Sequence, residues 1–436
     1  MKLEADVVLV GAGITGLWLL NILSQQGYRV ILLDNTGIGG WQSLHSQGII
    51  HRGVKYIGQK NKQSALEISR MASIWHDCLN FEKEDLNNKN NTHGLINLSK
   101  VPVLSQGHLI WTKAFWFSRL KNFIASRMLV SVSKVLSKKE HPEVFKNKNF
   151  SGSLCDCQEL VLDVPSLIKT LAMPYLSQIF LVPKEAEKIK YEWGQEDNQL
   201  CLKNMSWIDQ QTQEAVQLSA KTFILTAGEG IEVILKKLSL NHMKFKNIKW
   251  PRMQRRPLHM VFLKAKNLPE LYVHFVQTGL KPLLTLTTHS DQNQHKVWYL
   301  GGELAEQGVH RSAADQIQVA KKILSAWLPW VDLSQATFDS FLIDRAEGLT
   351  EIGDKPATPV INHLDEINNL ITIWPTKLTF APWVGFKILE ILKQKNLDSG
   401  RSNSSELLNL LNWQVSLKNL DIKKAPLLEA LWNQQK

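Results

Sequence analysis

A strand, a glycine turn and a helix at the start of this 436-residue chain constrain its fold more than any other feature. Residues 6–10 form a short apolar run rich in β-branched side chains, which is typical of a buried parallel strand. Gly11, Gly13 and Gly16 follow it in the spacing G-x-G-x-x-G. In this pattern Gly11 permits a tight turn, Gly13 lets backbone approach a pyrophosphate, and Gly16 lets the helix pack closely on the strand.

The helix and the next strand complete a dinucleotide-binding pattern. Ile14 and Thr15 open an apolar helical repeat, whose N-terminus offers N–H groups and a positive dipole end to phosphates. A second strand, residues 29–33, ends on Asp34, a carboxylate placed to accept hydrogen bonds from ribose hydroxyls. Glycine spacing alone also marks ordinary turns. Strand, glycines, helix, strand and terminal acid together predict a Rossmann-like nucleotide domain.

The loop that follows, residues 39–56, indicates which dinucleotide binds. Its His-Ser-x-Gly-x-Ile-His pattern resembles L-2-hydroxyglutarate oxidase, and its Ile-Ile-His-x-Gly-x-Lys-Tyr pattern resembles glycerol-3-phosphate dehydrogenase. Both belong to the D-amino-acid-oxidase-like superfamily of FAD-dependent oxidoreductases. The resemblance implies FAD, with the loop passing the diphosphate and flavin at Ser43, His45, Ser46, Gln47 and Gly48. The alternative is a glycine- and serine-rich loop with buried histidines.

Two later segments resemble the same superfamily. Gly228, at the end of a strand, would let backbone pass close to FAD. Lys377, Leu378 and Thr379 match a Gly-Gly-Lys-Leu-Thr segment that faces the flavin in glycerol-3-phosphate dehydrogenase, but residues 374–376 are Trp-Pro-Thr where the family has glycines. We therefore expect Trp374 to narrow the site and to slow turnover of glycerol 3-phosphate.

The resemblance also implies which residues act on the substrate. The reaction would be hydride transfer to the flavin from a C–H bond beside a hydroxyl or amine. Imidazole titrates near neutrality, so His51 and His259 are candidates for polarising or deprotonating a hydroxyl. The alternative for His259, which begins an apolar strand, is a structural histidine with hydrogen-bond partners in the protein. Three cations would bind the anionic end of the substrate and one phenol would add a hydrogen bond: Lys55, Arg345 and Lys377, with Tyr56. The alternative for Arg345 is a surface ion pair with Asp344 or Glu347.

The implied fold class is α/β, with a discontinuous Rossmann-like FAD-binding domain and an antiparallel-sheet substrate domain laid over the flavin. We expect the FAD-binding domain to comprise residues 1–78, 156–235 and 340–396. The substrate domain would comprise residues 79–155 and 236–339. Residues 397–436 would form a C-terminal helical tail, which either packs on the body or lies at a membrane interface.

Composition narrows the compartment and the partners. Hydrophobic residues make up 44% and charged residues 21%, as in globular proteins in water. A formal charge of +11 favours an anionic small substrate or surface. Four cysteines form no disulfide framework and no recognisable zinc motif, so we expect a reduced cytoplasmic compartment and no metal. No apolar segment is long enough to cross a membrane, which leaves at most peripheral membrane contact.

The sequence thus predicts an FAD-dependent oxidoreductase acting on a small anionic 2-hydroxy acid or polyol phosphate. Its electron acceptor would be oxygen, a quinone or another protein. One alternative is an amine or amino-acid oxidase of the same superfamily. Another is a flavoprotein that mainly binds RNA or a protein partner through the basic residues 236–256. Nucleic acid is the less favoured partner, because a solvated surface is the commoner explanation for a basic segment.

Overall fold

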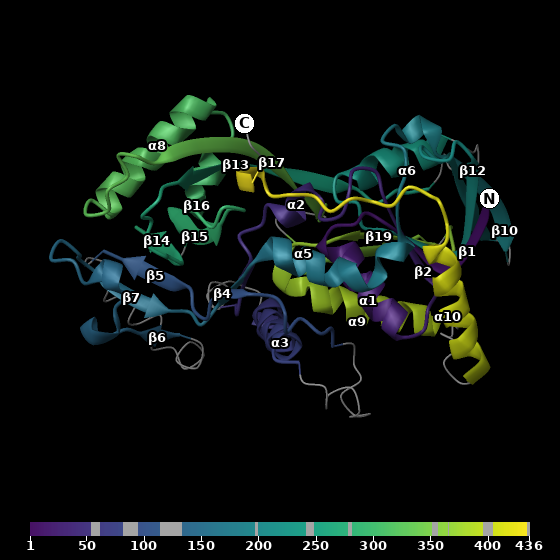
Figure 1. Ribbon diagram of the computed structural model, residues 1–436, viewed down its shortest axis with the longest axis horizontal. Helices are drawn as coiled ribbons and strands as arrows, with labels where there is room; N and C mark the ends of the chain where they lie inside the picture. Colours follow the sequence, from purple (N-terminus) through teal and green to yellow (C-terminus); the bar gives the residue numbers. More distant parts are fainter. Residues whose placement is uncertain are drawn as a thin grey trace.

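Two large sheets dominate the computed structural model of the chain (Figure 1). The structure describes the following residues: 1–53, 62–81, 95–113, 133–196, 199–240, 248–277, 281–350, 356–364, 366–395 and 404–433. Within these ranges, each large sheet has eight strands and a third sheet has three.

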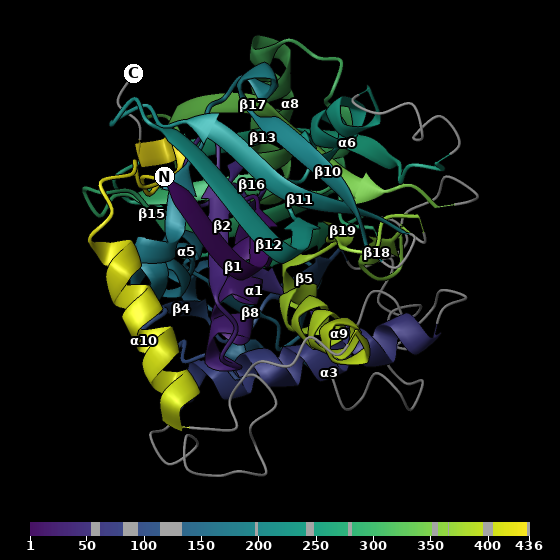
Figure 2. The same ribbon diagram turned by 90° about the vertical axis from the view of Figure 1, so that its right-hand side faces the viewer.

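The first sheet has a parallel centre, as the N-terminal pattern predicts. Its order is β10-β11-β12-β1-β2-β9, with β19 beside β12 and β18 beside β19. The parallel strands are β1 (Lys2–Val10), β2 (Val30–Asp34), β9 (Ile179–Leu181), β12 (Ala215–Leu225) and β19 (Leu370–Trp374). The antiparallel additions are β10 (Lys190–Glu196), β11 (Gln199–Ile208) and β18 (Val360–His363). Figure 2 shows β10, β11, β12 and β1 side by side.

Helices cover both faces of this sheet. The helices on one face are α1 (Ile14–Gln25), α5 (Val164–Ala172) and α9 (Ala381–Gln394), and their buried side chains share one core with β1 and β2. Against them lies α3 (Lys62–Leu79). On the opposite face, α6 (Gly230–Leu240) packs with β10–β12 around a second core. The apolar strands are buried on both sides, which is why they read as continuous hydrophobic runs.

The second large sheet is antiparallel except where β14 runs parallel to β5. Its strands in spatial order are β17 (Thr337–Gly348), β13 (Met253–Lys264), β16 (Lys296–Gly301), β15 (Leu284–Ser290), β14 (Val273–Val276), β5 (Leu109–Thr112), β7 (Ser153–Asp156) and β6 (Lys134–Val135). Its outer face packs on α8 (Ala313–Trp327). Its inner face meets α2 (Trp41–Leu44), part of the predicted flavin loop.

The remaining described elements are short. The third sheet joins β3 (Ile49–Ile50), β8 (Leu160–Leu162) and β4 (Val103–Ser105). A short helix, α7 (Glu303–Gln307), follows β16. The 3-10 turns are η4 (Lys138–Glu140), η5 (Glu143–Phe145), η6 (Met173–Gln178), η7 (Ala186–Lys188), η9 (Leu378–Phe380) and η10 (Leu431–Asn433). Mixed α/β layers of this kind are the predicted fold class.

The C-terminal segment is only partly helical, unlike the predicted helical tail. After α10 (Ser404–Lys418) the chain is extended, and it crosses from the first sheet to the second (yellow in Figure 1). Ile38 donates to the carbonyl of Pro426 at 2.7 Å, and Leu428 donates back to the carbonyl of Ile38 at 3.0 Å. We call residues 421–433 the C-terminal strap. Among the described helices, none has the length and apolarity to cross a membrane.

Candidate active site

The glycines of the first turn are required by close backbone contacts. A side-chain carbon built on Gly11 would lie 2.5 Å from the Cα of Ala227, and Gly11 has a φ of +114°. One built on Gly16 would lie 2.0 Å from the carbonyl oxygen of Gly11. A carbon on Gly13 would lie 2.9 Å from the Ser43 hydroxyl. The turn therefore holds the end of β1, the start of α1 and the next loop at distances that exclude side chains.

Asp34 shapes this turn. Its Oδ2 accepts a hydrogen bond from the Ala12 amide at 2.8 Å. Its Oδ1 accepts from the amides of Thr36 and Gly37 at 2.8 and 3.0 Å, and from the Thr36 hydroxyl at 3.0 Å. A carboxylate has about four lone-pair sites, so these bonds match its capacity. Binding a ribose hydroxyl, as predicted from the sequence, would require Asp34 to exchange one of them.

The residues around this edge fit FAD. The hydroxyls of Thr15, Ser46 and Thr376 are buried without a hydrogen-bond partner, although native buried polar groups almost always have one. They come from three of the segments predicted to line the cofactor. Gly228 has a φ of +56° and nothing within 4 Å of the position its side chain would take. These unpaired hydroxyls and this open space lie at the carboxyl ends of β1, β12 and β19. Parallel α/β sheets bind dinucleotides at that edge, so the arrangement suits FAD.

Ser43 and Gly48 hold the predicted flavin loop in place. The Ser43 hydroxyl accepts a hydrogen bond from the Ile14 amide at 2.9 Å, so it caps the start of α1. Gly48 has a φ of +72°, and its carbonyl accepts from the Leu162 amide at 2.9 Å. Both residues therefore position the loop through its backbone.

Gln47 and His45 face protein groups. Gln47 Nε2 donates to the carbonyls of Thr285 and Tyr299, both at 3.1 Å, and so ties the loop to β15 and β16. His45 Nδ1 lies 2.7 Å from the Trp41 carbonyl, while Leu431 of the C-terminal strap donates to its Nε2 at 3.3 Å. Burial lowers the pKa of His45. The structure thus gives these two predicted flavin contacts a role in joining the sheets.

His51 is brought to the predicted Lys377 segment. Its amide donates to the Thr379 hydroxyl at 2.9 Å, and the Thr379 carbonyl accepts from the Trp75 indole at 3.1 Å. Lys377 precedes η9, and its Nζ lies 5.3 Å from the centre of the Phe380 ring. Leu378 is the first residue of η9. The structure therefore places His51 and residues 377–379 on one wall. Lys55 and Tyr56 lie outside the described residues.

Sequence reasoning missed the acid and the imidazoles beside His51. Glu159 Oε2 lies 3.0 Å from His51 Nδ1 and 3.9 Å from His274 Nε2. The His108 ring packs against that of His274, with 3.9 Å between centroids and 37° between the ring planes. The Glu159 side chain is charged but only 1% exposed, and it directly precedes the apolar strand β8. An acid next to a buried strand was the one available signal, and it does not by itself distinguish a site from a solvated strand end.

His259 lies on the outer face of the second sheet. It shares this face of β13 with Val261 and Leu263, which pack toward α8, whereas Met260 and Phe262 point to the opposite face. Its Nδ1 lies 2.9 Å from the Gly308 carbonyl and its Nε2 lies 3.0 Å from the Ser340 hydroxyl. Both ring nitrogens thus have protein partners on the side away from the flavin loop. These contacts favour the structural interpretation of His259, and its role in deprotonation stays a prediction.

Arg345 joins an ion-pair network centred on Glu306. It lies 3.5 Å from Glu306, which also pairs with Arg256 and Lys281. Burial lowers the pKa of Arg345, and the neighbouring Arg256 acts in the same direction. Arg345 lies on β17, four strand positions from the β14 strand of His274. That separation is roughly 19 Å at the usual strand spacing. Arg345 therefore has carboxylate partners of its own on a strand well separated from that of His274, and a role for it in substrate binding stays a prediction.

Trp374 does not narrow the site, so that expectation is wrong. Its side chain is fully buried in the core around α6, and its indole N–H donates to the Gly228 carbonyl at 3.0 Å. In β19 it alternates with Ile371 and Ile373, which pack on the opposite face. The indole ring of Trp374 stands where the family has a glycine, and it fills the core around α6.

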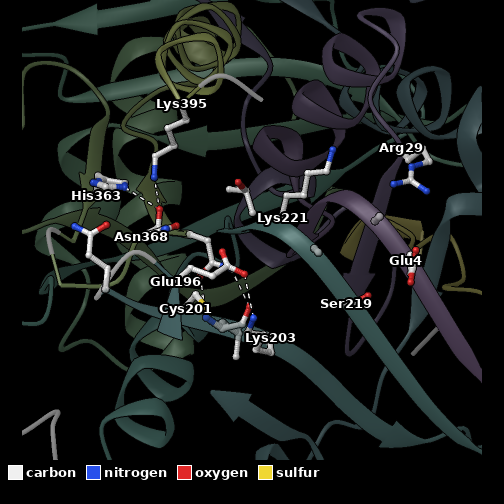
Figure 3. A pocket seen from close by; sticks show the side chains of 16 residues that line it. Glu4, Arg29, Glu196, Cys201, Lys203, Ser219, Lys221, His363, Asn368 and Lys395 are labelled. Atoms are coloured by element: carbon white, nitrogen blue, oxygen red, sulfur yellow. Dashed lines mark hydrogen bonds and ion pairs between the residues drawn. The ribbon is translucent and has the colours of Figure 1, made fainter. Parts of the chain in front are cut away.

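A surface pocket at the other end of the first sheet is a poor candidate for the active site (Figure 3). Glu4 and Arg29 line it near the start of the parallel strands, and Lys395 closes it from the end of α9. Parallel α/β sheets bind ligands at the carboxyl ends of their strands, which is the opposite edge. Across the described part of the chain, no group of three His, Cys, Asp or Glu side chains is arranged to hold a metal.

The basic stretch 236–256 has internal partners where the structure describes it. Lys237 donates to the carbonyl of Ile189 at 2.5 Å. Arg255 pairs with Glu232 at 2.8 Å, and Arg256 pairs with the buried Glu347 at 3.2 Å. Residues 241–247 lie outside the described ranges. Cations engaged in this way offer less charge to a nucleic acid than the sequence alone indicates.

Comparisons of the sequence and of the structure with known proteins both identify FAD-dependent oxidoreductases. The family model for FAD dependent oxidoreductases (DAO) matches residues 6–361. The probable FAD-dependent oxidoreductase PA4991 of Pseudomonas aeruginosa is 35% identical over 382 residues, covering 87% of this chain and 88% of that protein. The crystal structure of PA4991 superposes with a TM-score of 0.74 and 29% identity, covering 99% of this chain and 98% of that one.

Two more distant structures share the fold. Glycine oxidase from Geobacillus kaustophilus has a TM-score of 0.58 at 14% identity, covering 90% of this chain and 95% of that one. The L-α-glycerophosphate oxidase of Mycoplasma pneumoniae, with FAD bound, has a TM-score of 0.53 at 15% identity, covering 99% and 97%. One acts on an amine and the other on a hydroxyl compound by name, so the shared fold does not select the substrate class.

Proposed function

Because the chain belongs to the FAD-dependent oxidoreductase family, we propose that it oxidises the hydroxyl-bearing carbon of a small anionic substrate, either a 2-hydroxy acid or a polyol phosphate. The observation that carries this proposal is the placement of His51. Its imidazole is held by a buried carboxylate, and its backbone is bonded to the segment that follows Lys377. A base and a cation on one wall suit a substrate with both a hydroxyl and an anionic group.

The residues of this chain divide the work with the cofactor. FAD, when bound at the carboxyl edge, supplies the hydride acceptor. His51 takes the hydroxyl proton on Nε2 while its Nδ1 faces Glu159, so the oxygen gains electron density as the C–H bond breaks. Lys377 attracts the anionic end of the substrate. Lys55 and Tyr56 are further proposed contacts. Arg345 is left out because its partners lie in a separate network.

Anaerobic flavin bleaching tests the substrate class. Purified protein is mixed with 2-hydroxy acids, glycerol 3-phosphate or amino acids, and the loss of flavin absorbance is followed. We expect bleaching by a hydroxy acid or glycerol 3-phosphate, and a rate roughly 10²–10⁴-fold lower in His51→Asn, the range for a lost general base. Lys377→Met should weaken substrate handling by roughly ten- to a hundredfold through loss of a charge-assisted contact. Faster bleaching by amino acids would contradict the hydroxyl assignment and support an amine oxidase.

We also propose a reducing, cytoplasmic location. Cys78, Cys155, Cys157 and Cys201 are all unpaired and buried. Desolvation raises the pKa of Cys78 to about 12 and that of Cys155 to about 11, which makes both thiols poor nucleophiles and metal ligands at neutral pH. The electron acceptor is a separate question, and we propose that electrons pass from the flavin to oxygen, a quinone or another protein. The rate of flavin reoxidation by each acceptor distinguishes these possibilities.

A further inference from the structure

Glu159 is buried directly opposite His51 in a short antiparallel ladder. In the β3–β8 pair, Ile49 faces Val161 and Ile50 faces Leu160. The next step of that register brings His51 to Glu159. The carboxylate is 1% exposed, and its second oxygen accepts a hydrogen bond from the Arg52 amide at 3.2 Å. The backbone of two strands therefore fixes both partners of the His51–Glu159 pair.

The Glu159 carboxylate determines which ring nitrogen of His51 carries the hydrogen. An ionised carboxylate only accepts hydrogen bonds, so the nitrogen 3.0 Å from Glu159 carries the hydrogen. The neutral imidazole is then the Nδ1–H tautomer, whose basic nitrogen is Nε2. When Nε2 takes a proton, the positive ring lies against a buried negative charge, where the attraction is stronger than in water.

Resting on the proposed function, we propose that Glu159 is the positioning residue of the reaction. It holds His51 as the Nδ1–H tautomer and stabilises the imidazolium that forms when the substrate loses its hydroxyl proton. In that step the O–H bond breaks and its proton goes to Nε2 of His51. The hydrogen of the C–H bond would leave with both electrons as hydride, and FAD, when bound, would supply the acceptor. The substrate becomes a carbonyl compound.

Among the described residues, the groups near this pair include two imidazoles, Arg52 and the Asp156 carboxylate, which Glu159 influences through its charge. His274 approaches the same Glu159 oxygen at 3.9 Å, beyond hydrogen-bond distance, and its Nδ1 lies 2.9 Å from the Thr285 hydroxyl. The His108 ring packs against that of His274. Arg52 directs its guanidinium to the Gln158 side chain at 3.1 Å. Glu159 is thus the negative group in hydrogen-bond contact with His51 in the described part of the site.

The test uses holoenzyme labelled with ¹⁵N-histidine. NMR reports which ring nitrogen of His51 carries hydrogen, with His51→Asn identifying its signals. We expect the Nδ1–H form in the unmodified protein. In Glu159→Gln the charge is lost, so the pH midpoint of the His51 signals should fall by about one unit or more. The saturating rate of flavin bleaching should fall at least tenfold, while the half-saturating substrate concentration stays within about twofold.

Two further variants separate positioning from general stability. Glu159→Asp keeps the charge and should restore the midpoint and part of the rate. Asp209→Asn is the matched control, because Asp209 is also a fully buried carboxylate, but one bonded to Thr212 and Lys423. It should lower the melting temperature and leave the His51 signals unchanged. This control shows what loss of a buried carboxylate does by itself.

The outcomes distinguish this inference from the proposed function. If the tautomer and midpoint of His51 are the same in Glu159→Gln as in the unmodified protein, the positioning role is overturned even when His51→Asn abolishes bleaching. If His51→Asn leaves bleaching unchanged, the proposed base is wrong and the catalytic part of the inference is overturned with it.

Discussion

Gly16 and Gly228 both border the cofactor edge, but a methyl group would meet different surroundings at each. At Gly16 it would lie 2.0 Å from the Gly11 carbonyl oxygen and 3.0 Å from the Thr226 hydroxyl. At Gly228 no heavy atom lies within 4 Å. The first glycine is required by packing. No protein atom opposes a methyl group at the second, but its left-handed backbone costs other residues roughly 1–2 kcal/mol, and the methyl group would enter the space assigned to FAD.

We predict that Gly16→Ala separates α1 from the turn and abolishes FAD binding. Relieving an overlap with backbone typically costs about 1–3 kcal/mol of stability, and here it also moves the helix that faces the phosphates. Gly228→Ala should lower the melting temperature of the cofactor-free protein only slightly, because no protein atom opposes its methyl group. Flavin absorbance after purification and thermal melting measure both effects. Normal FAD content in Gly16→Ala would contradict this account of the turn.

Single residues also show where sequence reasoning stops. The pattern identifies Gly11 and Gly16, because their spacing reflects local backbone geometry. It places Asp34 correctly at the end of β2, but it does not reveal that four donors surround the carboxylate. Glu159 escapes notice because its importance comes from the β3–β8 register, which pairs residues more than 100 positions apart.

The face of the strand to which the side chain points determines the roles of His259 and Trp374. Neighbouring residues of a strand point to opposite faces, so a shift of one position changes a site residue into a core residue. Apolar neighbours surround both residues in sequence, and β13 and β19 are buried on both faces at these positions. The sequence therefore predicts the strands but not which face His259 or Trp374 occupies.

We predict that His259→Gln destabilises the protein without slowing flavin reduction. The imidazole joins β13 to the Gly308 carbonyl and to Ser340 of β17. Leaving a buried partner without its hydrogen bond costs about 1–3 kcal/mol. Denaturant unfolding and anaerobic bleaching at saturating substrate measure the two quantities. A large fall in bleaching rate with unchanged stability would return His259 to the active site.

At the scale of the molecule, the C-terminal strap joins the two large sheets. It pairs with Ile38 beside the first sheet and ends with Trp432 buried on the inner face of the second. Trp432 packs on His289 and Tyr299 with ring centroids 5.2 Å apart in both cases. The sequence predicts helix here because leucines recur, whereas the extended part depends on hydrogen bonds to distant backbone that no local pattern reports.

We predict that Trp432→Ala releases the strap. Truncating a fully buried aromatic side chain typically costs about 3–5 kcal/mol. Leu427→Ala is the matched control in the same segment, since Leu427 is 39% exposed and should cost little. Limited proteolysis should cut residues 421–433 faster in Trp432→Ala than in the control. Equal cleavage rates in the two variants would show that Trp432 does not anchor the strap.

The strap should also make stability depend on pH through His289. Burial lowers the pKa of His289 to about 4, and the ring lies against Trp432 with its Nε2 bonded to the Thr287 hydroxyl. In the unfolded chain a histidine titrates near 6.5. Between these values the unfolded state binds the extra proton, so stability is fully present above about pH 6.5 and is lost as the pH falls toward 4. The contribution of His289 to the unfolding free energy falls by about 2 kcal/mol between pH 7 and pH 5.

His289→Phe tests this directly, because phenylalanine keeps an aromatic ring against Trp432 but does not titrate. We expect its unfolding free energy to fall less between pH 7 and pH 5 than that of the unmodified protein. Burial also lowers the pKa of His45, which accepts a hydrogen bond from the strap at Leu431, so some pH dependence should persist. Urea unfolding at several pH values measures both curves. Parallel curves would mean that His289 is protonated equally in the folded and unfolded states, contrary to its burial against the strap.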